Sequence, residues 1–322
     1  MSTQTVPTQP SATPAERKPV TVLSLAAMHR RGEPIAMLTA YDYPSARIAD
    51  EAGIDVLLVG DSLAMVVLGH PDTLAVTMDE MLHHARAVRR GAERALLVGD
   101  MPFLSYQVDV PEAVRNAGRF VKEAGMHAVK LEGGHSVVPQ VRAIVAAGIP
   151  VMGHVGLTPQ SVNALGGWKV QGRTPEAAER LVEDALALQE AGCFAIVLES
   201  VPDRLATWLS ARLDVPTIGI GAGAGTGGQV LVYHDLLGLF ERFTPKFVRR
   251  YAELGAASRA AVERFREDVA ERAFPTADHA YPMADEAWEA FLARVEGPAN
   301  APSSAPPAAA AANGAAKGGA RG

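Results

Sequence analysis

Two apolar runs that end in the same acid, VLLVGD at residues 56–61 and ALLVGD at residues 95–100, decide the fold of this chain. Each run is apolar at every position before its glycine, so neither shows the alternation of a strand with one face in water. Such strands are typical of parallel sheets that helices cover on both faces. A carboxylate at the end of a buried strand costs free energy unless a partner is close by. Asp61 and Asp100 therefore need a partner.

Further runs of the same kind alternate with helical segments along the chain. The other expected strands are IAMLTAYD (35–42), HAVKLEGG (127–134), IPVMGHVG (149–156), FAIVLES (194–200), PTIGIGAG (216–223) and QVLVYHD (229–235). Segment 174–192 predicts a helix with Thr174 as N-cap, Pro175 in the first turn and Gly192 as its stop. Segments 111–125 and 135–148 follow the same pattern. Roughly eight strand–helix units predict a (β/α)8 TIM barrel, and a doubly wound open sheet is the alternative, because periodicity does not reveal closure.

The ends of the chain differ in composition from its centre. Residues 1–17 are rich in Thr, Pro, Ser and Gln, and residues 298–322 consist mostly of Ala, Pro, Gly and Ser. Segments with so few large apolar side chains are expected to be disordered tails. We expect residues 18–297 to form a single barrel domain with a C-terminal helical extension, EAWEAFLARVEG at 286–297.

The overall composition excludes several classes of protein. A hydrophobic content of 48% supplies material for a large core, and a formal net charge of -6 without a dense Lys/Arg cluster disfavours a nucleic-acid partner. Cys193 is the only cysteine, so no intramolecular disulfide and no cysteine-based zinc site are expected. No stretch has the length of a membrane span, and the N-terminus lacks a signal peptide's apolar core. We therefore expect a cytoplasmic protein without membrane contact.

Charged and polar side chains follow most of the expected strands: Tyr41, Asp42, Asp61, Ser62, Asp100, Lys130, Glu132, His154, Glu199 and Ser200. In a barrel the C-terminal strand ends meet at one face, whereas in an open sheet they converge only at a switch point. A helix N-cap explains any single acid of this kind but explains the whole set poorly. Carboxylates grouped with one lysine and one histidine favour Mg²⁺ and an oxygen-rich substrate, and His154 is a weak argument for zinc because its spacing fits no zinc motif.

Two glycine-rich segments and three further histidines need an interpretation. In GIGAGAGTGG (219–228), Gly223, Gly225 and Gly228 match the motif G-x-G-x-x-G. A strand-like segment follows them instead of a helix, so a dinucleotide site is disfavoured. HVGLTPQSVNALGGWKVQGRT (154–174) lacks clear periodicity, and such long loops usually form lids or bind ligands. We expect His83 and His84 to lie on the surface and His127 to be structural.

A set of motifs in fixed order resembles the ketopantoate hydroxymethyltransferase family. The motifs are LTAYDYPSARIADEAGIDVLLVGDSLAMVVLGH, VGDMPF, KLEGG, VMGHVGLTPQS, GGWKVQGR, VLESVP and TIGIGAG, and the likeness runs from about residue 20 to residue 282. The resemblance implies a (β/α)8 barrel of the phosphoenolpyruvate/pyruvate-binding type that uses Mg²⁺ and forms homo-oligomers, typically decamers. It also implies transfer of a one-carbon unit from 5,10-methylenetetrahydrofolate to 3-methyl-2-oxobutanoate, the first step of pantothenate biosynthesis.

The resemblance assigns roles to six residues at matching motif positions. Asp61 and Asp100 would bind the metal and contact the substrate, and Glu132 would hold the metal directly or through water. Ser62 and Lys130 would contact the keto acid. Glu199 would accept the proton next to the keto group, and burial at the end of its strand would raise its pKa toward neutral. Tyr41 and His154 are expected in or near the same pocket.

Two other classes of function remain open from the sequence. A barrel of the isocitrate-lyase or phosphoenolpyruvate-mutase kind would use the same Mg²⁺–enolate chemistry with another electrophile or with bond cleavage, although the KLEGG and GHVGLTPQS motifs argue against it. A binding module that has lost catalysis is disfavoured, because a candidate base, metal ligands and a lysine are all present.

Overall fold

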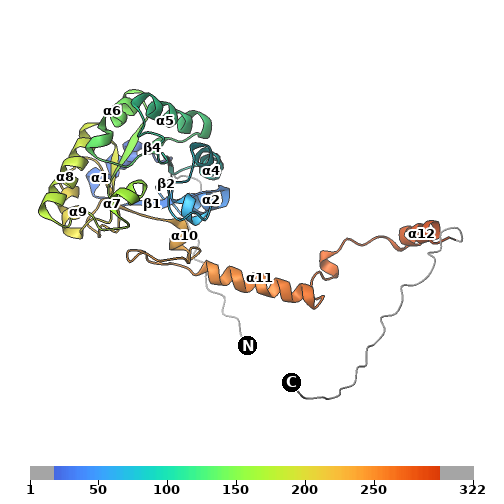
Figure 1. Ribbon diagram of the computed structural model, residues 1–322. Coiled ribbons are helices and arrows are strands. Elements are labelled where there is room, and N and C mark those ends of the chain that lie inside the picture. Colours follow the sequence, from blue (N-terminus) through green and yellow to red (C-terminus); the bar gives the residue numbers. More distant parts are fainter. Residues whose placement is uncertain (1–17, 298–322) are drawn as a thin grey trace, which may run out of the picture. The chain divides into compact units, whose positions relative to one another are not determined.

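The computed structural model describes residues 18–297, which form two compact units. The first unit ends at Ser258, and the second begins at Arg259. In the first unit eight parallel strands close into a barrel in chain order (Figure 1). They are β1 (Ile35–Thr39), β2 (Val56–Val59), β3 (Leu96–Asp100), β4 (Ala128–Lys130), β5 (Val151–Gly156), β6 (Ala195–Glu199), β7 (Thr217–Ile220) and β8 (Gly228–Leu231). β8 pairs with β1 from Ile35–Gly228 to Leu38–Leu231. The predicted barrel is confirmed, and the open sheet is excluded.

Helices surround the strands, as Figure 1 shows. They are α1 (Val22–Arg31), α2 (Tyr43–Glu51), α3 (Leu63–Val66), α4 (Met78–Gly91), α5 (Val110–Ala124), α6 (Val138–Ala146), α7 (Val162–Leu165), α8 (Pro175–Glu190), α9 (Asp203–Ser210) and α10 (Tyr233–Leu236). Short 3-10 helices η2 (His135–Val137) and η3 (Pro159–Ser161) precede α6 and α7. The three predicted helices correspond to α8, α5 and the pair η2–α6, and Thr174 caps α8 by accepting from the Ala177 N–H.

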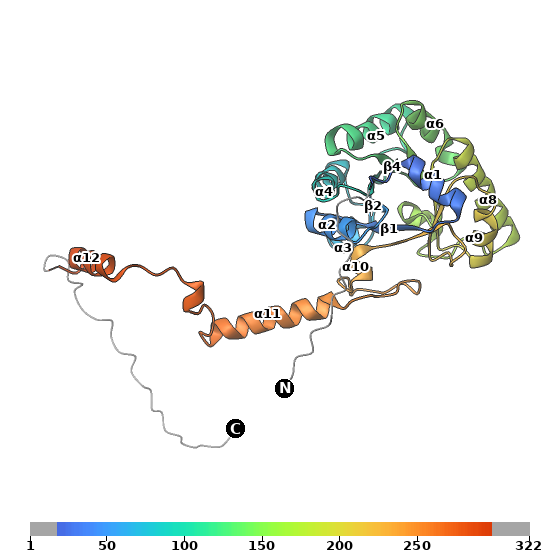
Figure 2. The ribbon, with the colours of Figure 1, turned by 180° about the vertical axis from the view of Figure 1, so that it is seen from behind.

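Two apolar cores follow from the parallel topology. Outward-facing strand residues pack against the helices, and inward-facing residues such as Met37, Val98 and Val197 fill the barrel. Leu25 of α1 joins the inner core, so α1 packs at the end of the barrel where the strands begin; Figure 2 shows this helix in front of the strands. Cys193 is 2% exposed and belongs to the outer core.

The second unit, up to residue 297, has no buried residue in its helical elements. α12 (Asp285–Val295) overlaps the segment 286–297 of the predicted extension, and Trp288 stacks on Phe291 with ring centroids 5.4 Å apart. η4 (Ala277–His279) precedes α12, and α11 (Leu254–Ala270) precedes η4. The tails predicted at residues 1–17 and 298–322 lie outside the described residues. Among residues 18–297 no helix is both long and apolar enough to cross a membrane.

Candidate active site

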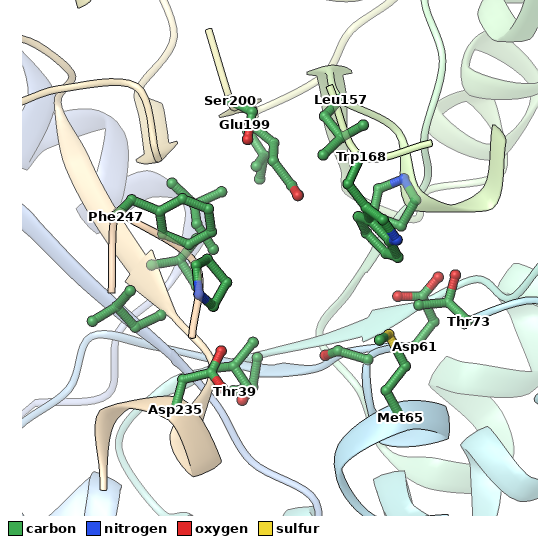
Figure 3. Close-up of a pocket in the computed structure, with 18 of the residues that line it drawn as sticks. Thr39, Asp61, Met65, Thr73, Leu157, Trp168, Glu199, Ser200, Asp235 and Phe247 are labelled. Carbon is green, nitrogen blue, oxygen red and sulfur yellow. The ribbon is translucent and has the colours of Figure 1, made fainter. Parts of the chain in front are cut away.

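A cavity of about 580 Å³ opens at the C-terminal ends of the strands. It brings together all six residues to which the family resemblance assigns a role: Asp61, Ser62, Asp100, Lys130, Glu132 and Glu199. Figure 3 shows Glu199 and Asp61 on different walls of this cavity, with Trp168 on the same side as Asp61. The convergence of these side chains follows from the barrel, because every strand ends at the same face.

The alternation of side chains along four strands points three of these residues, and His154 beside them, inward. Leu96 and Val98 fill the barrel interior, so Asp100, two residues further on, faces the same side. The same spacing of two places Lys130 above Ala128, His154 above Met152, and Glu199 above Val197. Each of these four strands therefore gives apolar packing inside the barrel and one polar side chain toward its C-terminal end.

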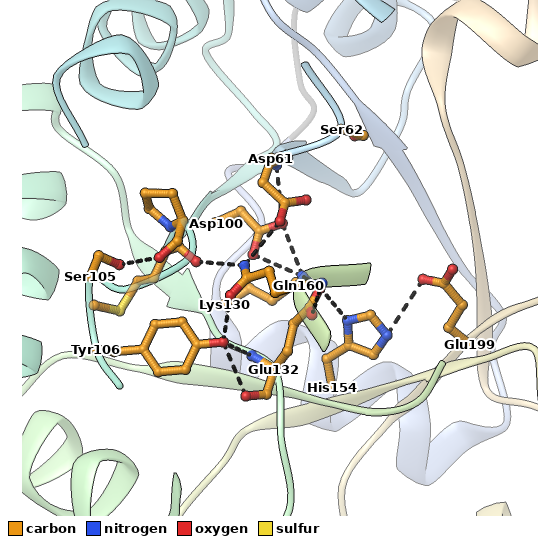
Figure 4. A network of polar contacts seen from close by, with 12 residues as sticks. Asp61, Ser62, Asp100, Ser105, Tyr106, Lys130, Glu132, His154, Gln160 and Glu199 are labelled. Carbon is orange, nitrogen blue, oxygen red and sulfur yellow. Dashed lines mark hydrogen bonds and ion pairs between the residues drawn. The ribbon is translucent and has the colours of Figure 1, made fainter. Parts of the chain in front are cut away.

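Lys130 and Asp100 form a buried ion pair at the centre of the polar network in Figure 4. The Lys130 ammonium donates to both carboxylate oxygens of Asp100, at 2.8 and 2.9 Å, and lies 3.7 Å from Glu132 Oε1. The side chains of the pair are only 5% and 2% exposed. Burial opposes the charge on Lys130, but its three carboxylate neighbours together raise the pKa of the ammonium above its usual value.

Asp61 lies beside this pair in an environment with too little positive charge. Its backbone N–H donates to Asp100 Oδ2 at 3.2 Å. Burial raises the pKa of Asp61 well above its ordinary value, and the neighbouring Asp100 and Glu132 raise it further. Burial also raises the pKa of Asp100, although Lys130 opposes the shift. The cluster is therefore chemically suited to a further cation.

Gln160 joins two carboxylates of the cluster, and the sequence analysis did not single it out. Its Nε2 donates to Asp61 Oδ2 at 2.9 Å, and its backbone N–H donates to Glu132 Oε2 at 3.0 Å. Its Oε1 accepts from the Tyr106 hydroxyl at 2.8 Å. The residue belongs to η3, within the glycine-rich segment 154–174 that we predict to be a binding loop. The signals that pointed to this region were the length of the loop and the motif VMGHVGLTPQS, which contains Gln160.

His154 lies between Glu132 and Glu199, as Figure 4 shows. Its Nδ1 is 3.5 Å from Glu132 Oε1, and its Nε2 is 3.4 Å from Glu199 Oε2. Neither ring nitrogen has a hydrogen-bond partner of good geometry, and the same is true of Glu132 Oε1. Burial raises the pKa of Glu199 to about 7, although the neighbouring His154 opposes the shift. A carboxylate with such a pKa is suited to accept a proton near neutral pH.

Ser62 lines the cavity next to Asp61, and the buried Tyr41 contacts the Ser62 hydroxyl. The Tyr41 hydroxyl and Ser62 Oγ lie 2.9 Å apart, and Tyr41 is 2% exposed. Tyr41 does not itself line the cavity, whereas His154 does. The expectation that both lie in or near the pocket is confirmed in this form.

The carboxylates of the cluster have the ligand chemistry that Mg²⁺ prefers, although they are not arranged as a preformed metal site. Among residues 18–297 no three Asp, Glu, His or Cys side chains are arranged as a metal cage. The raised pKa values of Asp61 and Asp100 nevertheless indicate two carboxylates without enough positive charge around them. Glu132 has a lowered pKa, and its Oε1 has no hydrogen-bond partner of good geometry and is a further oxygen donor. Because Mg²⁺ often binds one or two carboxylates and completes its shell with substrate and water, the residues present fit this ion.

Three other expectations have clear outcomes. The strand β8 begins at Gly228, where a dinucleotide-binding motif would begin a helix. The glycine-rich segment therefore does not form that motif. His127 is structural, because its Nδ1 accepts from the Leu97 N–H at 3.1 Å. The prediction for His84 is wrong: this histidine is half-buried, and its Nδ1 lies 2.6 Å from the carbonyl oxygen of Tyr41. The helical face of α4 that carries His84 packs toward α2, which periodicity alone did not reveal.

Comparisons with known proteins agree with the site. A family model described as ketopantoate hydroxymethyltransferase matches residues 19–277. A 3-methyl-2-oxobutanoate hydroxymethyltransferase of Moorella thermoacetica is 62% identical over 265 residues, which cover 82% of this chain and 98% of that protein. One of Nitratidesulfovibrio vulgaris (strain DP4) is 56% identical over 298 residues, covering 92% of this chain and 96% of that protein.

Similar solved structures share the fold at low sequence identity. A phosphonopyruvate hydrolase superposes with a TM-score of 0.55 at 16% identity, covering 87% of this chain and 99% of that one. A 2,3-dimethylmalate lyase of the PEP mutase/isocitrate lyase superfamily superposes with a TM-score of 0.51 at 17% identity, covering 85% and 98%. These structures show the barrel type alone. From the family model and the close relatives we conclude that the chain is an enzyme and belongs to the ketopantoate hydroxymethyltransferase family.

Proposed function

We propose that this enzyme transfers a hydroxymethyl group from 5,10-methylenetetrahydrofolate to 3-methyl-2-oxobutanoate, which gives ketopantoate and tetrahydrofolate. The observation that carries the proposal is the pairing of two features in one cavity. A cluster of three carboxylates and one ammonium is suited to hold a keto acid and a cation, and Glu199, with its pKa near 7, lines the same space. The family membership favours this transfer over lyase or mutase chemistry.

The residues that would hold Mg²⁺ are Asp61, Asp100 and Glu132, the last directly or through water. When bound, Mg²⁺ supplies positive charge that stabilises the negative charge developing on the keto oxygen. Lys130 adds a second positive charge at the same place, and Ser62 offers a hydroxyl beside Asp61 for the substrate. These assignments rest on the resemblance and on the geometry of the cluster.

Glu199 would start the reaction by accepting the proton at C3 of the keto acid. The electron pair of the broken C–H bond moves into the enolate, and C3 then forms a bond to the methylene carbon of the folate. One bond from that carbon to a folate nitrogen breaks before C3 attacks, and the second breaks afterwards. Water supplies the hydroxyl group of the product, and the remaining proton of that water and the proton held by Glu199 go to the two folate nitrogens. His154 lies 3.4 Å from Glu199 and would keep its carboxylate directed at the substrate.

Oligomeric state and location extend the same proposal. The family resemblance implies a homo-oligomer, typically a decamer, and a cytoplasmic enzyme with small-molecule substrates. Light scattering of the purified chain tests the first of these statements: a mass near that of ten chains supports it, and a monomer mass contradicts it.

A product assay tests the proposed function. The purified chain is incubated with 3-methyl-2-oxobutanoate and 5,10-methylenetetrahydrofolate, with Mg²⁺ or with EDTA, and ketopantoate is measured by mass spectrometry. We expect product with Mg²⁺, none with EDTA, and none from the double variant Asp61→Ala, Asp100→Ala. Asp214→Ala, which changes an exposed carboxylate in the loop before β7, is the matched control. No product from the wild-type chain contradicts the proposal, and full activity in EDTA contradicts its metal part.

A further inference from the structure

The cavity is larger than the keto acid requires. Its volume of about 580 Å³ lies in the range of sites that bind drug-sized ligands. A small keto acid held at the Lys130 cluster fills only part of that space. Two segments contribute a large share of the remaining lining: the loop after β5 and the chain that follows α10.

These two segments give the outer part of the cavity aromatic walls. The chain after α10 contributes Phe240, Phe243 and Phe247, and the rings of the first two meet edge to face with centroids 5.5 Å apart. The loop after β5 contributes Trp168, which is 48% exposed. Figure 3 shows Trp168 and Phe247 on opposite sides of the opening. Two such walls are suited to the faces of a flat ring system.

One acid in this outer part has no partner. Asp235 lies in α10 and lines the cavity, and Figure 3 shows it next to Thr39. Among residues 18–297 its carboxylate makes no hydrogen bond and no ion pair, although it is only partly exposed. Burial raises its pKa to about 6, with Arg250 opposing the shift, so at neutral pH it is mostly ionised and can accept hydrogen bonds.

Two lysines stand at the exposed edge of the same region. Lys169 follows Trp168 in one segment and Lys246 precedes Phe247 in the other, and both line the cavity with exposed side chains. Positive charge at the rim attracts an anionic group that stays in contact with water. The outer part thus combines an acceptor inside, aromatic walls and cations at the rim.

We propose that this outer part is the folate subsite and that Asp235 recognises the pterin ring. The carboxylate of Asp235 accepts hydrogen bonds from the 2-amino group and the N3–H of the ring, which present two donors on one edge. Trp168 and Phe247 pack against the ring system, and Lys169 and Lys246 pair with the carboxylates of the glutamyl tail. The inference rests on the proposed function, because it names the place of that reaction's second substrate.

Direct binding tests this assignment. Tetrahydrofolate is titrated into the full chain by calorimetry, with Mg²⁺ and 3-methyl-2-oxobutanoate present, for wild type, Asp235→Asn and Asp235→Ala. Because hydrogen bonds to a charged group are among the stronger ones, we expect both variants to bind about ten- to a hundredfold more weakly. Asp214→Asn is the matched control and should bind like wild type. Melting temperatures establish that each variant is folded. If Asp235→Ala does not fold, the isosteric variant Asp235→Asn still tests the assignment.

A second ligand separates the two ends of the subsite. The tail-less 6-methyltetrahydropterin should lose affinity with Asp235→Asn but keep it in the double variant Lys169→Ala, Lys246→Ala. Tetrahydrofolate should lose affinity in both. Wild-type-like binding of tetrahydrofolate by both Asp235 variants, or no binding by wild type, overturns the subsite. Exchange of the keto acid's C3 proton with solvent needs no folate and tests the proposed function separately. If the wild-type chain does not exchange this proton, the proposed function is contradicted. If it exchanges the proton but the binding results differ from those expected, only the folate subsite is contradicted.

Discussion

Asp100 and Lys130 occupy paired positions on neighbouring strands, β3 and β4, and the Lys130 ammonium contacts both oxygens of the Asp100 carboxylate. Asp61 and Glu132 lie around the same ammonium, so three buried carboxylates share one positive charge. Burial, with the neighbouring carboxylates adding to it, raises the pKa values of Asp61 and Asp100, although Lys130 opposes both shifts. The shortage of positive charge gives the site a physical reason to bind a cation.

Replacing Lys130 should destabilise the barrel in a pH-dependent way. Lys130→Met leaves Asp100 buried without its cation, and such a loss costs about 3–5 kcal/mol of unfolding free energy. The cost should be largest at about pH 8, where the carboxylates are ionised, and smaller at about pH 5, where raised pKa values allow protonation. Urea denaturation at both pH values measures it. Lys122→Met, an exposed lysine of α5, is the control, and equal stability of the two variants at about pH 8 contradicts the account.

Gln160 should set the affinity for magnesium, because it orients Asp61 and Glu132 at once. Groups that orient metal ligands typically change metal affinity by about 10- to 100-fold when they are mutated. We expect Gln160→Leu to weaken Mg²⁺ binding by that amount in calorimetry, a readout independent of turnover. Gln189→Leu on α8 is the matched control. Unchanged Mg²⁺ affinity in Gln160→Leu removes this role.

Gly156 should be irreplaceable beside Glu199. Its φ is +97°, a backbone conformation that residues with a side chain rarely adopt. An added Cβ would also collide with the carbonyl oxygen of Glu199. Gly156→Ala should therefore cost about 1–3 kcal/mol of unfolding free energy and lower kcat by displacing Glu199. Gly118→Ala is the control, because it lies in α5 with no atom within 4 Å of the added Cβ, and it should stabilise the chain by about 0.5–1 kcal/mol. Equal effects of the two substitutions on kcat contradict this role of Gly156.

The pH profile of proton exchange should report Glu199. Since its pKa is about 7, its carboxyl group is protonated below that pH and cannot act as a base. The rate of C3 proton exchange should therefore rise with pH and reach half its maximum near pH 7. The measurement uses saturating Mg²⁺ throughout, so that metal affinity does not limit the rate. A flat profile between about pH 5 and pH 8 contradicts the assignment.

The sequence predicts the strands well, because most are apolar on both faces and half of them end at a polar residue. The boundaries are less accurate where that signal continues past the strand. The run 127–134 extends beyond β4, which ends at Lys130. Inward alternation along β3, β4 and β6 also explains why the sequence alone places Asp100, Lys130 and Glu199 at one face of the barrel.

Residues that reach the site from loops were not predictable in the same way. Gln160 lies on a 3-10 helix, and its side chain reaches Asp61, 99 positions earlier in the sequence. Asp235 ends the strand predicted at 229–235, but that boundary is wrong: β8 ends at Leu231, and Asp235 lies on the four-residue helix α10. Their roles depend on where tertiary packing places the loops, and neither periodicity nor spacing carries that information.

The most direct test of the central claim follows the C3 proton of 3-methyl-2-oxobutanoate in deuterated water by NMR, with Mg²⁺ and without folate. The wild-type chain should exchange this proton, and Glu199→Gln should be slower by about 100- to 10,000-fold, the usual contribution of a general base. Glu190→Gln, at the exposed end of α8, should behave like wild type. Exchange by Glu199→Gln at the wild-type rate would contradict the claim that Glu199 is the base of this active site.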